Sequence, residues 1–226
     1  MTARLFSLIV LCGVVLVAAL PARGDAPEDR SVPNIIFIMA DDLGYGDPGC
    51  YGGTRIETPN IDRLAREGTR FTECYSGAPV CAPARCVLMT GLHTGHGRIR
   101  DNGPQVGGVV EAFGEGGHRL SLTGEELTVA KALQAVGYRT GASGKWGLSE
   151  PDTPGTPNRM GFDDWLGYLN QNHAAYYYTD FLWENEEKRP IPENDGINGT
   201  VYSNDLFRDF AVDFIRKNRE RPFFLY

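Results

Sequence analysis

The sequence has no excess of basic residues. Its 226 residues include 22 Lys and Arg but 29 Asp and Glu, which gives a formal net charge of −7. A surface that binds nucleic acid needs clustered Lys and Arg to neutralise phosphates. We therefore expect no nucleic-acid partner, whereas a local site for a small anion is compatible with this charge.

The sequence also lacks an apolar run of the length that a membrane span requires. The run at residues 5–20 holds about 16 residues, and a spanning helix needs roughly 20. It follows a positively charged start and leads into small and polar residues near Ala22 and Gly24, a pattern typical of a secretory signal peptide. We predict that residues 1–24 are a signal peptide and that the protein is exported, periplasmic or secreted, without a stable membrane anchor. A retained anchor is the alternative.

Cysteine is scarce, with five residues in the chain. Cys12 lies inside the apolar run and would be removed with it. The other four would lie in a compartment that permits disulfides; they are Cys50, Cys74, Cys81 and Cys86. Four cysteines in roughly 200 residues are too few for a disulfide scaffold. A single bridge such as Cys50 with Cys74 is possible, but the spacing of the cysteines does not select this pair.

What the sequence does contain is the composition of a globular chain with a core. Apolar residues make up 42% and charged residues 23%, and no internal repeat is visible. The run IIFIMADD, at 35–42, predicts a strand that is buried on both faces, as in a parallel sheet. A Gly- and Pro-rich loop follows, and then a helical pattern that places Ile61 and Leu64 on one face and ends at Gly68.

A second unit has a helix followed by a strand. Thr123 and Glu126 fit a capping box, and the apolar stripe that begins at Val129 predicts a helix that ends at Gly137, before the strand YRTGASGKW. A third helix over 203–218 leads into the apolar strand PFFLY. Helices that alternate with buried strands are typical of an α/β fold with a mostly parallel sheet flanked by helices.

The strand PFFLY ends at the last residue, Tyr226. A buried strand needs neighbours and a connection beyond it. We therefore expect that residues 25–226 are the N-terminal portion of a longer catalytic domain. A terminal edge strand is the alternative.

Two adjacent carboxylates, Asp41 and Asp42, follow the first predicted strand. In an α/β sheet, ligands collect where the carboxyl ends of the strands open into loops. Adjacent carboxylates repel each other, and a hard divalent cation with oxygen ligands relieves that repulsion. A pair of solvated loop acids, one of which caps a turn, is the alternative.

The stretch CAPARCVLMTG, residues 81–91, places reactive groups at the start of another helix. Pro83 suits the first turn of a helix, so Cys81 would lie at or just before the helix N-terminus, where backbone N–H groups and the helix dipole favour an anion. Arg85 follows one turn later on the same side and can hold an anionic group with two hydrogen bonds. A small buried cysteine, with an arginine paired to a surface acid, is the alternative.

CAPARCVLMTG and four other segments, in a fixed order along the chain, carry a resemblance to a known family. The others are IIFIMADDLGYGD, TPNIDRLAREGTRFTECY, SGKWGL and RPFFLY. CAPARCVLMTG resembles the motif Cys-x-Pro-Ser-Arg followed by Leu-x-Thr-Gly. The others resemble the opening strand, the helix after it, the Gly-Lys-Trp-His-Leu segment and the next strand of the formylglycine-dependent, arylsulfatase-like sulfatases of the alkaline-phosphatase superfamily. The resemblance runs from about Asn34 to Tyr226.

This resemblance implies an alkaline-phosphatase-like α/β fold and a set of site residues. It implies that a formylglycine-generating maturation enzyme oxidises Cys81 to formylglycine. It also implies that Asp41 and Asp42 bind Ca²⁺ or Mg²⁺ together with the formylglycine oxygen from position 81. Arg85 would hold the hydrated aldehyde, and Lys145 would contact both the sulfate and the leaving oxygen.

The chain departs from the family pattern in three ways. Ala84 stands where the motif most often has Ser or another small residue, which leaves the Cys, Pro and Arg positions intact. Gly147 stands where many members have a sulfate-binding histidine, so that contact is missing or comes from elsewhere. His173 is a candidate for it, and a loop histidine bonded to a neighbouring backbone group is the alternative. The resemblance implies that the family's second pair of metal ligands, a later histidine and a later lysine would lie beyond Tyr226.

The resemblance implies a sulfuric ester hydrolase that releases inorganic sulfate from an aryl or carbohydrate sulfate ester, so that its partner is a sulfated small molecule or polysaccharide. One hydroxyl of the aldehyde hydrate attacks sulfur and expels the alcohol, and the other then collapses to release sulfate and restore the aldehyde. A phosphonate or phosphate ester hydrolase of the same superfamily and a catalytically inactive secreted binding protein are the alternatives. We expect little or no turnover from the 226 residues by themselves.

Overall fold

The computed structural model describes residues 32–103 and 120–226. The predicted signal peptide, residues 1–24, lies outside the described residues. The chain divides into two units, Met1–Val32 and Pro33–Tyr226, and the second holds the sheet, the helices and the candidate site. Within the described ranges, no helix has the length and apolar character that crossing a membrane would require.

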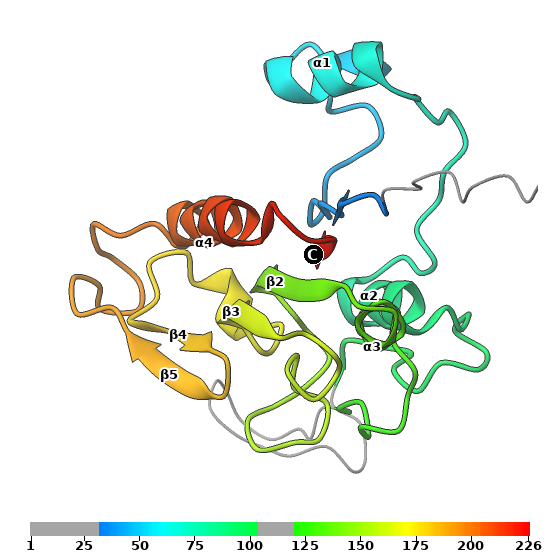
Figure 1. Ribbon diagram of the computed structural model, residues 1–226. Helices are drawn as coiled ribbons and strands as arrows, with labels where there is room; N and C mark the ends of the chain where they lie inside the picture. Colours follow the sequence, from blue (N-terminus) through cyan, green and yellow to red (C-terminus); the bar gives the residue numbers. More distant parts are fainter. Residues whose placement is uncertain (1–31, 104–119) are drawn as a thin grey trace, which may run out of the picture. The chain divides into compact units, whose positions relative to one another are not determined.

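A six-stranded sheet forms the centre of the unit Pro33–Tyr226 (Figure 1). Its strands are β1 (Ile35–Ile36), β2 (Arg139–Lys145), β3 (Asp164–Tyr168), β4 (Phe181–Glu184), β5 (Glu187–Pro190) and β6 (Phe223–Leu225), in the spatial order β1-β6-β2-β3-β4-β5. The first four in that order are parallel, whereas β4 and β5 form an antiparallel hairpin beside β3. The carboxyl ends of the parallel strands therefore share one edge, where ligands collect in such sheets.

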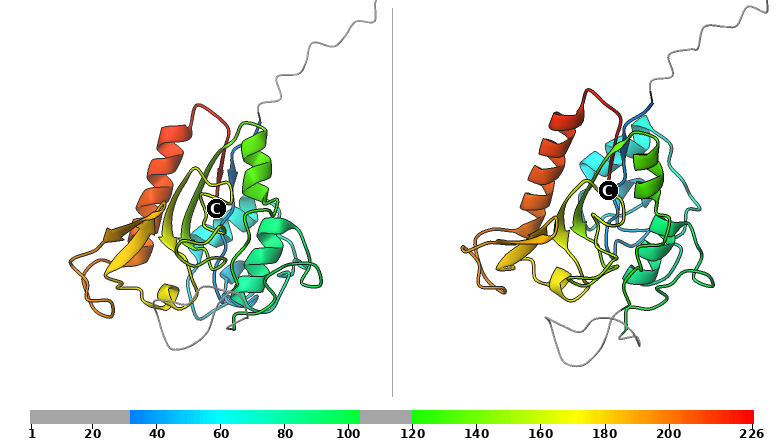
Figure 2. Two further views of the ribbon diagram at one scale, coloured as in Figure 1. Left: turned by 90° about the horizontal axis from the view of Figure 1, so that it is seen from below. Right: turned by 60° about the horizontal axis from the view of Figure 1, so that its bottom comes forward.

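Helices cover both faces of this sheet (Figure 2). Helix α4 (Ser203–Asn218) packs on one face, and α3 (Val129–Ala135) lies on the other face with α2 (Cys81–Thr90) beside it. Helix α1 (Pro59–Glu67) has no buried residue. Two short 3-10 turns complete the described elements, η1 (Gly49–Tyr51) and η2 (His173–Ala175).

The strand β6 shows why two helical layers form. Its side chains alternate between the faces of the sheet, as a period of two dictates. Phe224 belongs to the hydrophobic cluster on the α2 and α3 side, whereas Phe223 and Leu225 pack with Phe214 of α4. Phe214 and Phe223 meet edge to face at a centroid distance of 5.9 Å. A strand in which every residue is apolar is therefore buried on both faces.

The larger hydrophobic cluster lies on the α2 and α3 side and fixes the end of β2. Trp146 and Phe162 are almost fully buried and meet edge to face at 5.8 Å. The indole N–H of Trp146 donates to the carbonyl of Gly155 at 2.9 Å, so burial leaves this donor paired. Because Trp146 follows β2 directly, this packing also positions Lys145, the last residue of β2.

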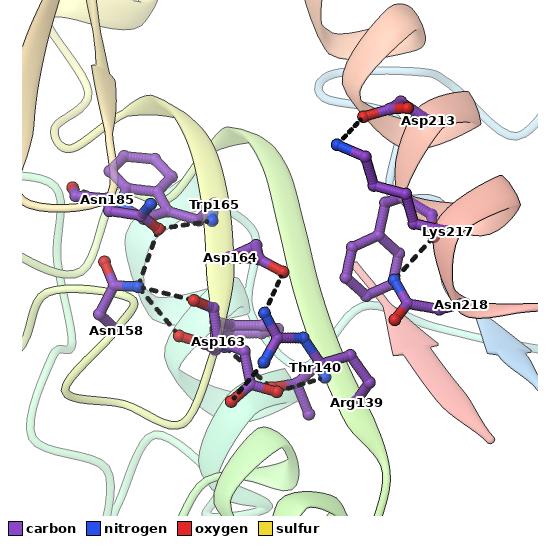
Figure 3. A network of polar contacts seen from close by, with 12 residues as sticks. Arg139, Thr140, Asn158, Asp163, Asp164, Trp165, Asn185, Asp213, Lys217 and Asn218 are labelled. Atoms are coloured by element: carbon purple, nitrogen blue, oxygen red, sulfur yellow. Dashed lines mark hydrogen bonds and ion pairs between the residues drawn. The ribbon is translucent and has the colours of Figure 1, made fainter. Parts of the chain in front are cut away.

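A polar network ties the amino ends of β2 and β3 to the hairpin (Figure 3). Arg139 donates to Asp164 at 2.6 Å, and Oδ1 of Asn185 accepts from the Asn158 side chain at 3.0 Å and from the Trp165 backbone N–H at 3.1 Å. Arg139 and Asp164 are the first residues of their strands. These charged groups therefore stabilise the edge of the sheet opposite to the one where ligands collect.

The structure confirms the predicted α/β fold with a mostly parallel sheet flanked by helices. The helix predicted over 203–218 is α4, the predicted strand YRTGASGKW contains β2, and α1 ends before Gly68 as predicted. Strand β6 lies between β1 and β2, so the alternative of a terminal edge strand is wrong.

The prediction of a doubly buried strand over 35–42 is wrong. Only Ile35 and Ile36 form β1, although the backbone N–H of Phe37 also bonds to Leu225 at 2.8 Å. Ile36 and Ile38 are 50% and 82% exposed. Among the described strands, β1 lies at the edge of the sheet and pairs with β6 alone. An edge strand has neighbouring side chains on one side only, so its faces are less well covered than those of a central strand.

The predicted capping box does not cap a helix. Thr123 and Glu126 do bond to each other, since the Thr123 N–H donates to the Glu126 carboxylate at 2.8 Å. Helix α3, however, begins at Val129, where the hydroxyl of Thr128 accepts from the Lys131 N–H at 3.1 Å. A second threonine, closer to the apolar stripe, takes the capping position.

The four described cysteines are free thiols, so the possible bridge between Cys50 and Cys74 does not form.

Candidate active site

Asp41, Asp42 and Cys81 form a cluster at the carboxyl edge of the sheet. One possible ligand atom from each lies within 4.8 Å of the others, and the described residues hold no other group of three or more His, Cys, Asp or Glu side chains this close together. The two aspartates follow β1, and Cys81 is the first residue of α2. Asp42 has a φ of 56°, in the left-handed region that aspartate tolerates better than most residues.

The start of α2 favours a negative charge at Cys81. The helix has ten residues, and its first-turn N–H groups point toward this end. Its N-cap residue, Val80, provides no side-chain cap, and the N–H of Ala82 donates to Oδ1 of Asn102 at 2.7 Å. Cys81 is half-buried, whereas Cys86 is fully buried in the hydrophobic cluster. Of these two thiols, Cys81 is the accessible one.

Two cationic side chains lie against this cluster. Nζ of Lys145 pairs with Oδ2 of Asp41 at 2.7 Å, and Nη2 of Arg85 lies 3.8 Å from Oδ1 of the same carboxylate. The side chain of Lys145 is 14% exposed and that of Arg85 is 5% exposed, so water screens their charges poorly. The cluster therefore combines two acids, which can hold a cation, with two cations, which can hold an anion.

The pKa of Asp41 is lowered by this arrangement. Partial burial by itself raises the pKa, but the hydrogen bond and charge of Lys145 and the charge of Arg85 outweigh burial. A hydrogen bond with Cys81 lowers the pKa further. Asp41 is therefore ionised at neutral pH, which is the state that a ligand of a hard cation needs.

Two oxygen acceptors fix the orientation of Arg85. Its Nη1 donates to the carbonyl of Lys145 and to the hydroxyl of Tyr226, the latter at 2.9 Å. The Tyr226 ring packs against Phe37 and Phe162 at centroid distances of 6.1 and 6.3 Å. Burial raises the pKa of Tyr226, so its hydroxyl keeps its proton at neutral pH. No local sequence motif predicts this role of Tyr226, because its contact with Arg85 joins positions 141 residues apart.

His173, the sequence candidate for substrate binding, is held inside the protein. Its ring is packed by Tyr168 and Phe181 at centroid distances of 4.8 and 4.4 Å, and Nε2 bonds to the Thr179 hydroxyl at 2.7 Å. The residue is 2% exposed, and burial lowers its pKa to about 4. A hydrogen bond with the Phe181 backbone matches the alternative of a histidine bonded to a neighbouring backbone group, and these contacts give a substrate-binding role no support.

The ligand atoms of the cluster fit a hard divalent cation in part. Carboxylate oxygens, such as those of Asp41 and Asp42, are the donors that Ca²⁺ and Mg²⁺ prefer. The sulfur of Cys81 is a soft donor and suits those ions poorly. An oxygen in place of that sulfur would complete a set of hard donors.

A cavity of about 630 Å³ opens beside the cluster. Asp41, Arg85 and Lys145 line part of it, and apolar side chains of residues 36–40 and of α4 line much of the remainder. Tyr177, which is 54% exposed, also lines the cavity. Its volume lies within the range of typical small-molecule sites.

Comparison with known proteins identifies the family. The model of the family described as Sulfatase matches residues 33–226, which is most of the chain. The chain belongs to the sulfatase family. The N-acetylglucosamine-6-O-sulfatase of Bacteroides thetaiotaomicron is 33% identical to it over 198 residues, which are 87% of this chain and 30% of that protein. Human arylsulfatase A is 44% identical over 136 residues, which are 60% of this chain and 25% of that protein.

The solved structures of sulfatases confirm the alkaline-phosphatase-like fold of this sulfatase chain. The crystal structure of Ps i-CgsB in complex with k-i-k-neocarrahexaose aligns with a TM-score of 0.67 at 32% identity. The alignment covers 86% of this chain and 44% of that chain. The chain thus spans less than a third of the length of the curated relatives named above and less than half of this structure.

Proposed function

We propose that the protein to which this chain belongs hydrolyses a sulfate ester and releases inorganic sulfate. The observation that carries the proposal is that Cys81 lies in one cluster with Asp41 and Asp42, and that Lys145 and Arg85 lie against the same cluster. A cation site, an anion site and an accessible reactive group at a helix start then occupy one edge of a parallel sheet. These are the parts that transfer of a sulfuryl group requires.

The proposed nucleophile is a formylglycine that a maturation enzyme makes from Cys81. The thiol of Cys81 is free and half-buried, and it stands where the oxygen of the converted residue would lie. The hydrated aldehyde supplies two hydroxyls on one carbon, one to attack sulfur as the alcohol leaves and one to release sulfate as the aldehyde is restored. Conversion also replaces a soft sulfur by a hard oxygen beside the two acids.

Asp41 and Asp42 would hold the cation, Ca²⁺ or Mg²⁺. A bound divalent ion supplies positive charge next to the sulfate and favours an ionised hydroxyl. Asp41 also pairs with Lys145, so the same carboxylate orients the ammonium group. Arg85, which Tyr226 and the Lys145 carbonyl hold in place, presents a fixed positive charge to the converted residue and to the sulfate.

Lys145 would act on both ends of the ester bond. Its ammonium group carries three N–H donors, and the contact with Asp41 at 2.7 Å uses one of them. The remaining donors can stabilise the sulfate oxygens and the oxygen of the departing alcohol, where negative charge develops. We therefore assign Lys145 to both substrate binding and catalysis.

The names of the relatives support a sulfated saccharide as substrate. One relative is named N-acetylglucosamine-6-O-sulfatase, and Ps i-CgsB was solved in complex with k-i-k-neocarrahexaose. An aryl sulfate is the second candidate, because arylsulfatase A is also similar to this chain. The signal-peptide pattern of residues 1–24 supports export, where extracellular sulfated polysaccharides are met.

The test is sulfate release by the full protein, produced together with a formylglycine-generating enzyme. We expect release from N-acetylglucosamine 6-sulfate or from nitrophenyl sulfate, and a loss of at least about 100-fold in kcat/KM in Cys81→Ala and in Lys145→Ala. Faster release of phosphate from nitrophenyl phosphate would instead make the protein a phosphate ester hydrolase. Saccharide binding without release from any ester would make it an inactive binding protein.

A further inference from the structure

Gly147 leaves one position beside the active site without a side chain. It lies two residues after Lys145 and has a φ of 75°. Its N–H donates to the carbonyl of Leu169 at 2.9 Å, which continues the pairing of β2 with β3 beyond the ends of both strands. The residues that follow Leu169 therefore run next to Gly147.

The side chain of Gln171 fills the space at Gly147. Its Nε2 donates to the Gly147 carbonyl at 3.1 Å. A Cβ added to Gly147 would lie 2.2 Å from that nitrogen and 3.4 Å from Cδ of Arg85. Since real Cβ contacts are not as short as 2.2 Å, the Gln171 amide would have to move from this place if position 147 carried a side chain. The amide of Gln171 thus lies next to the stem of Arg85.

Two polar atoms at this place have no hydrogen-bond partner among the residues that the structure describes. Oε1 of Gln171 and Nε of Arg85 are both buried and unpaired. A buried polar atom without a partner carries a desolvation penalty, so native structures pair nearly all of them. One of these atoms is an acceptor and the other is a donor. A ligand that satisfies both must offer an acceptor to Arg85 and a donor to Gln171.

The sulfate ester of a sugar offers both groups. Its sulfate oxygens are acceptors, and a hydroxyl on the same ring is a donor. An aryl sulfate offers the acceptors alone. The residue Gln171 is half-buried, and the next residue, Asn172, is exposed.

We infer that Gln171 is a specificity-determining residue, whose Oε1 accepts a hydrogen bond from a hydroxyl of the esterified sugar beside the sulfate that Arg85 and Lys145 hold. This inference rests on the proposed function and narrows its substrate to a carbohydrate sulfate. The contact is made with the sugar, which does not change during the reaction, so it lowers KM more than it raises kcat.

The kinetic test compares Gln171→Ala with the unchanged full protein, after maturation, on two esters. We expect the KM for N-acetylglucosamine 6-sulfate to rise about 10-fold, with kcat changed less than about 3-fold. The KM for nitrophenyl sulfate should stay within about 2-fold, because that ester has no hydroxyl for Oε1. Gln134→Ala is the matched control, since the Gln134 amide bonds at 2.8 Å to Asp163, in the network at the amino ends of the strands.

A second test measures packing and needs no turnover. Gly147→Ala should lower the melting temperature by several degrees, and by clearly less when Gln171→Ala is also present, because the added Cβ meets the Gln171 amide. The strain at a φ of 75° is common to both backgrounds and cancels in this comparison. Additive effects of the two substitutions would overturn the assigned packing and the inference with it.

The outcomes separate the inference from the proposed function. No sulfate release from either ester by the unchanged protein would overturn both. Release from nitrophenyl sulfate alone, or an equal rise of KM for both esters in Gln171→Ala, would overturn the inference and leave the sulfatase activity standing. A rise in KM that is confined to the sugar ester supports it.

Discussion

Arg85 depends on groups from three separate parts of the chain. Its guanidinium donates to the Lys145 carbonyl and to the Tyr226 hydroxyl, and it lies 3.8 Å from the Asp41 carboxylate. These partners stand at or just after the ends of β2, β6 and β1, which are adjacent parallel strands. The sheet therefore sets where the positive charge of Arg85 lies.

Tyr226→Phe tests this dependence on one hydroxyl. The change removes the 2.9 Å hydrogen bond to Arg85 and keeps the ring that packs against Phe162. We expect kcat/KM for the sulfate ester to fall about 10-fold in the full protein, because Arg85 is less well oriented. Tyr138→Phe is the control, since its hydroxyl donates at 2.9 Å to the Pro33 carbonyl. Equal losses of activity in the two variants would mean that Tyr226 acts through general stability alone.

His173 makes the folded state sensitive to acid. Burial lowers its pKa from 6.5 to about 4, so between these values the unfolded chain binds a proton that the folded chain does not. The contribution of His173 to stability is therefore complete above pH 6.5 and is lost as the pH falls toward 4. The loss over this window amounts to about 3 kcal/mol.

The measurement is urea unfolding at pH 7.5 and at pH 4 for the unchanged protein and for His173→Gln. We expect the unchanged protein to lose about 3 kcal/mol more than the variant between the two pH values. The same loss in both proteins would show that His173 titrates normally in the folded state.

Short motifs predict part of the candidate site. The two acids after the first strand, Cys81, Arg85 and Lys145 each lie in a recognisable segment, and the structure brings them together. Tyr226 and Gln171 could not be predicted in this way. Their contacts join residues that are 141 and 24 positions apart, and those contacts depend on which strands are neighbours.

At the scale of elements, β2 and β3 approach closely at two glycines. Gly144 and Gly167 are register partners, and a Cβ on Gly167 would lie 1.8 Å from the Gly144 carbonyl oxygen. Gly167→Ala must therefore move β3 away from β2. We expect a loss of about 2 kcal/mol in the free energy of unfolding.

Urea unfolding measures this loss, and Gly46→Ala is the matched control. A Cβ on Gly46 would meet no atom within 4 Å, so we expect its effect to stay within about 0.5 kcal/mol. If Gly167→Ala unfolds at the same urea concentration as Gly46→Ala, the two strands do not pack as closely as described.

Elements with a strong apolar pattern could be predicted from the sequence, and others could not. Helix α4 and strand β6 carry apolar residues at the spacing that burial against the sheet demands. The hairpin of β4 and β5 was missed, because all four residues of β5 are exposed and three of them are charged. Asn185 lies in the turn of this hairpin with a φ of 54°. A single asparagine predicts a turn only weakly when the segments on each side are not recognisable as strands.

At the scale of the whole molecule, the charge of the chain opposes its proposed substrate. The net charge is −7, so a sulfated ligand is repelled over most of the surface and attracted where Arg85 and Lys145 lie. A bound divalent cation at Asp41 and Asp42 would add to that local attraction. Because the chain spans 30% and 25% of two curated relatives, tests of activity belong to the full protein.

Calcium should stabilise the matured full protein if this cation site forms. At a Ca²⁺ concentration 100 times the dissociation constant, we expect a gain of about 2.7 kcal/mol, seen as a higher melting temperature that a chelator reverses. Asp42→Asn should remove most of the gain. Asp152→Asn should keep it, although Asp152 is also exposed and also lies in the left-handed region, at a φ of 62°. Equal responses in the two variants would contradict the assignment of Asp42 as a ligand.

The most direct measurement is the mass of the tryptic peptide 71–85, taken from the full protein purified in its active form. This peptide holds both Cys74 and Cys81, so fragmentation assigns any change to one of them and uses the other as an internal standard. We predict that residue 81 is lighter by about 18 Da than an unmodified cysteine, as conversion to formylglycine requires, and that Cys74 is unchanged. Active protein in which residue 81 is an intact thiol would contradict the proposed mechanism.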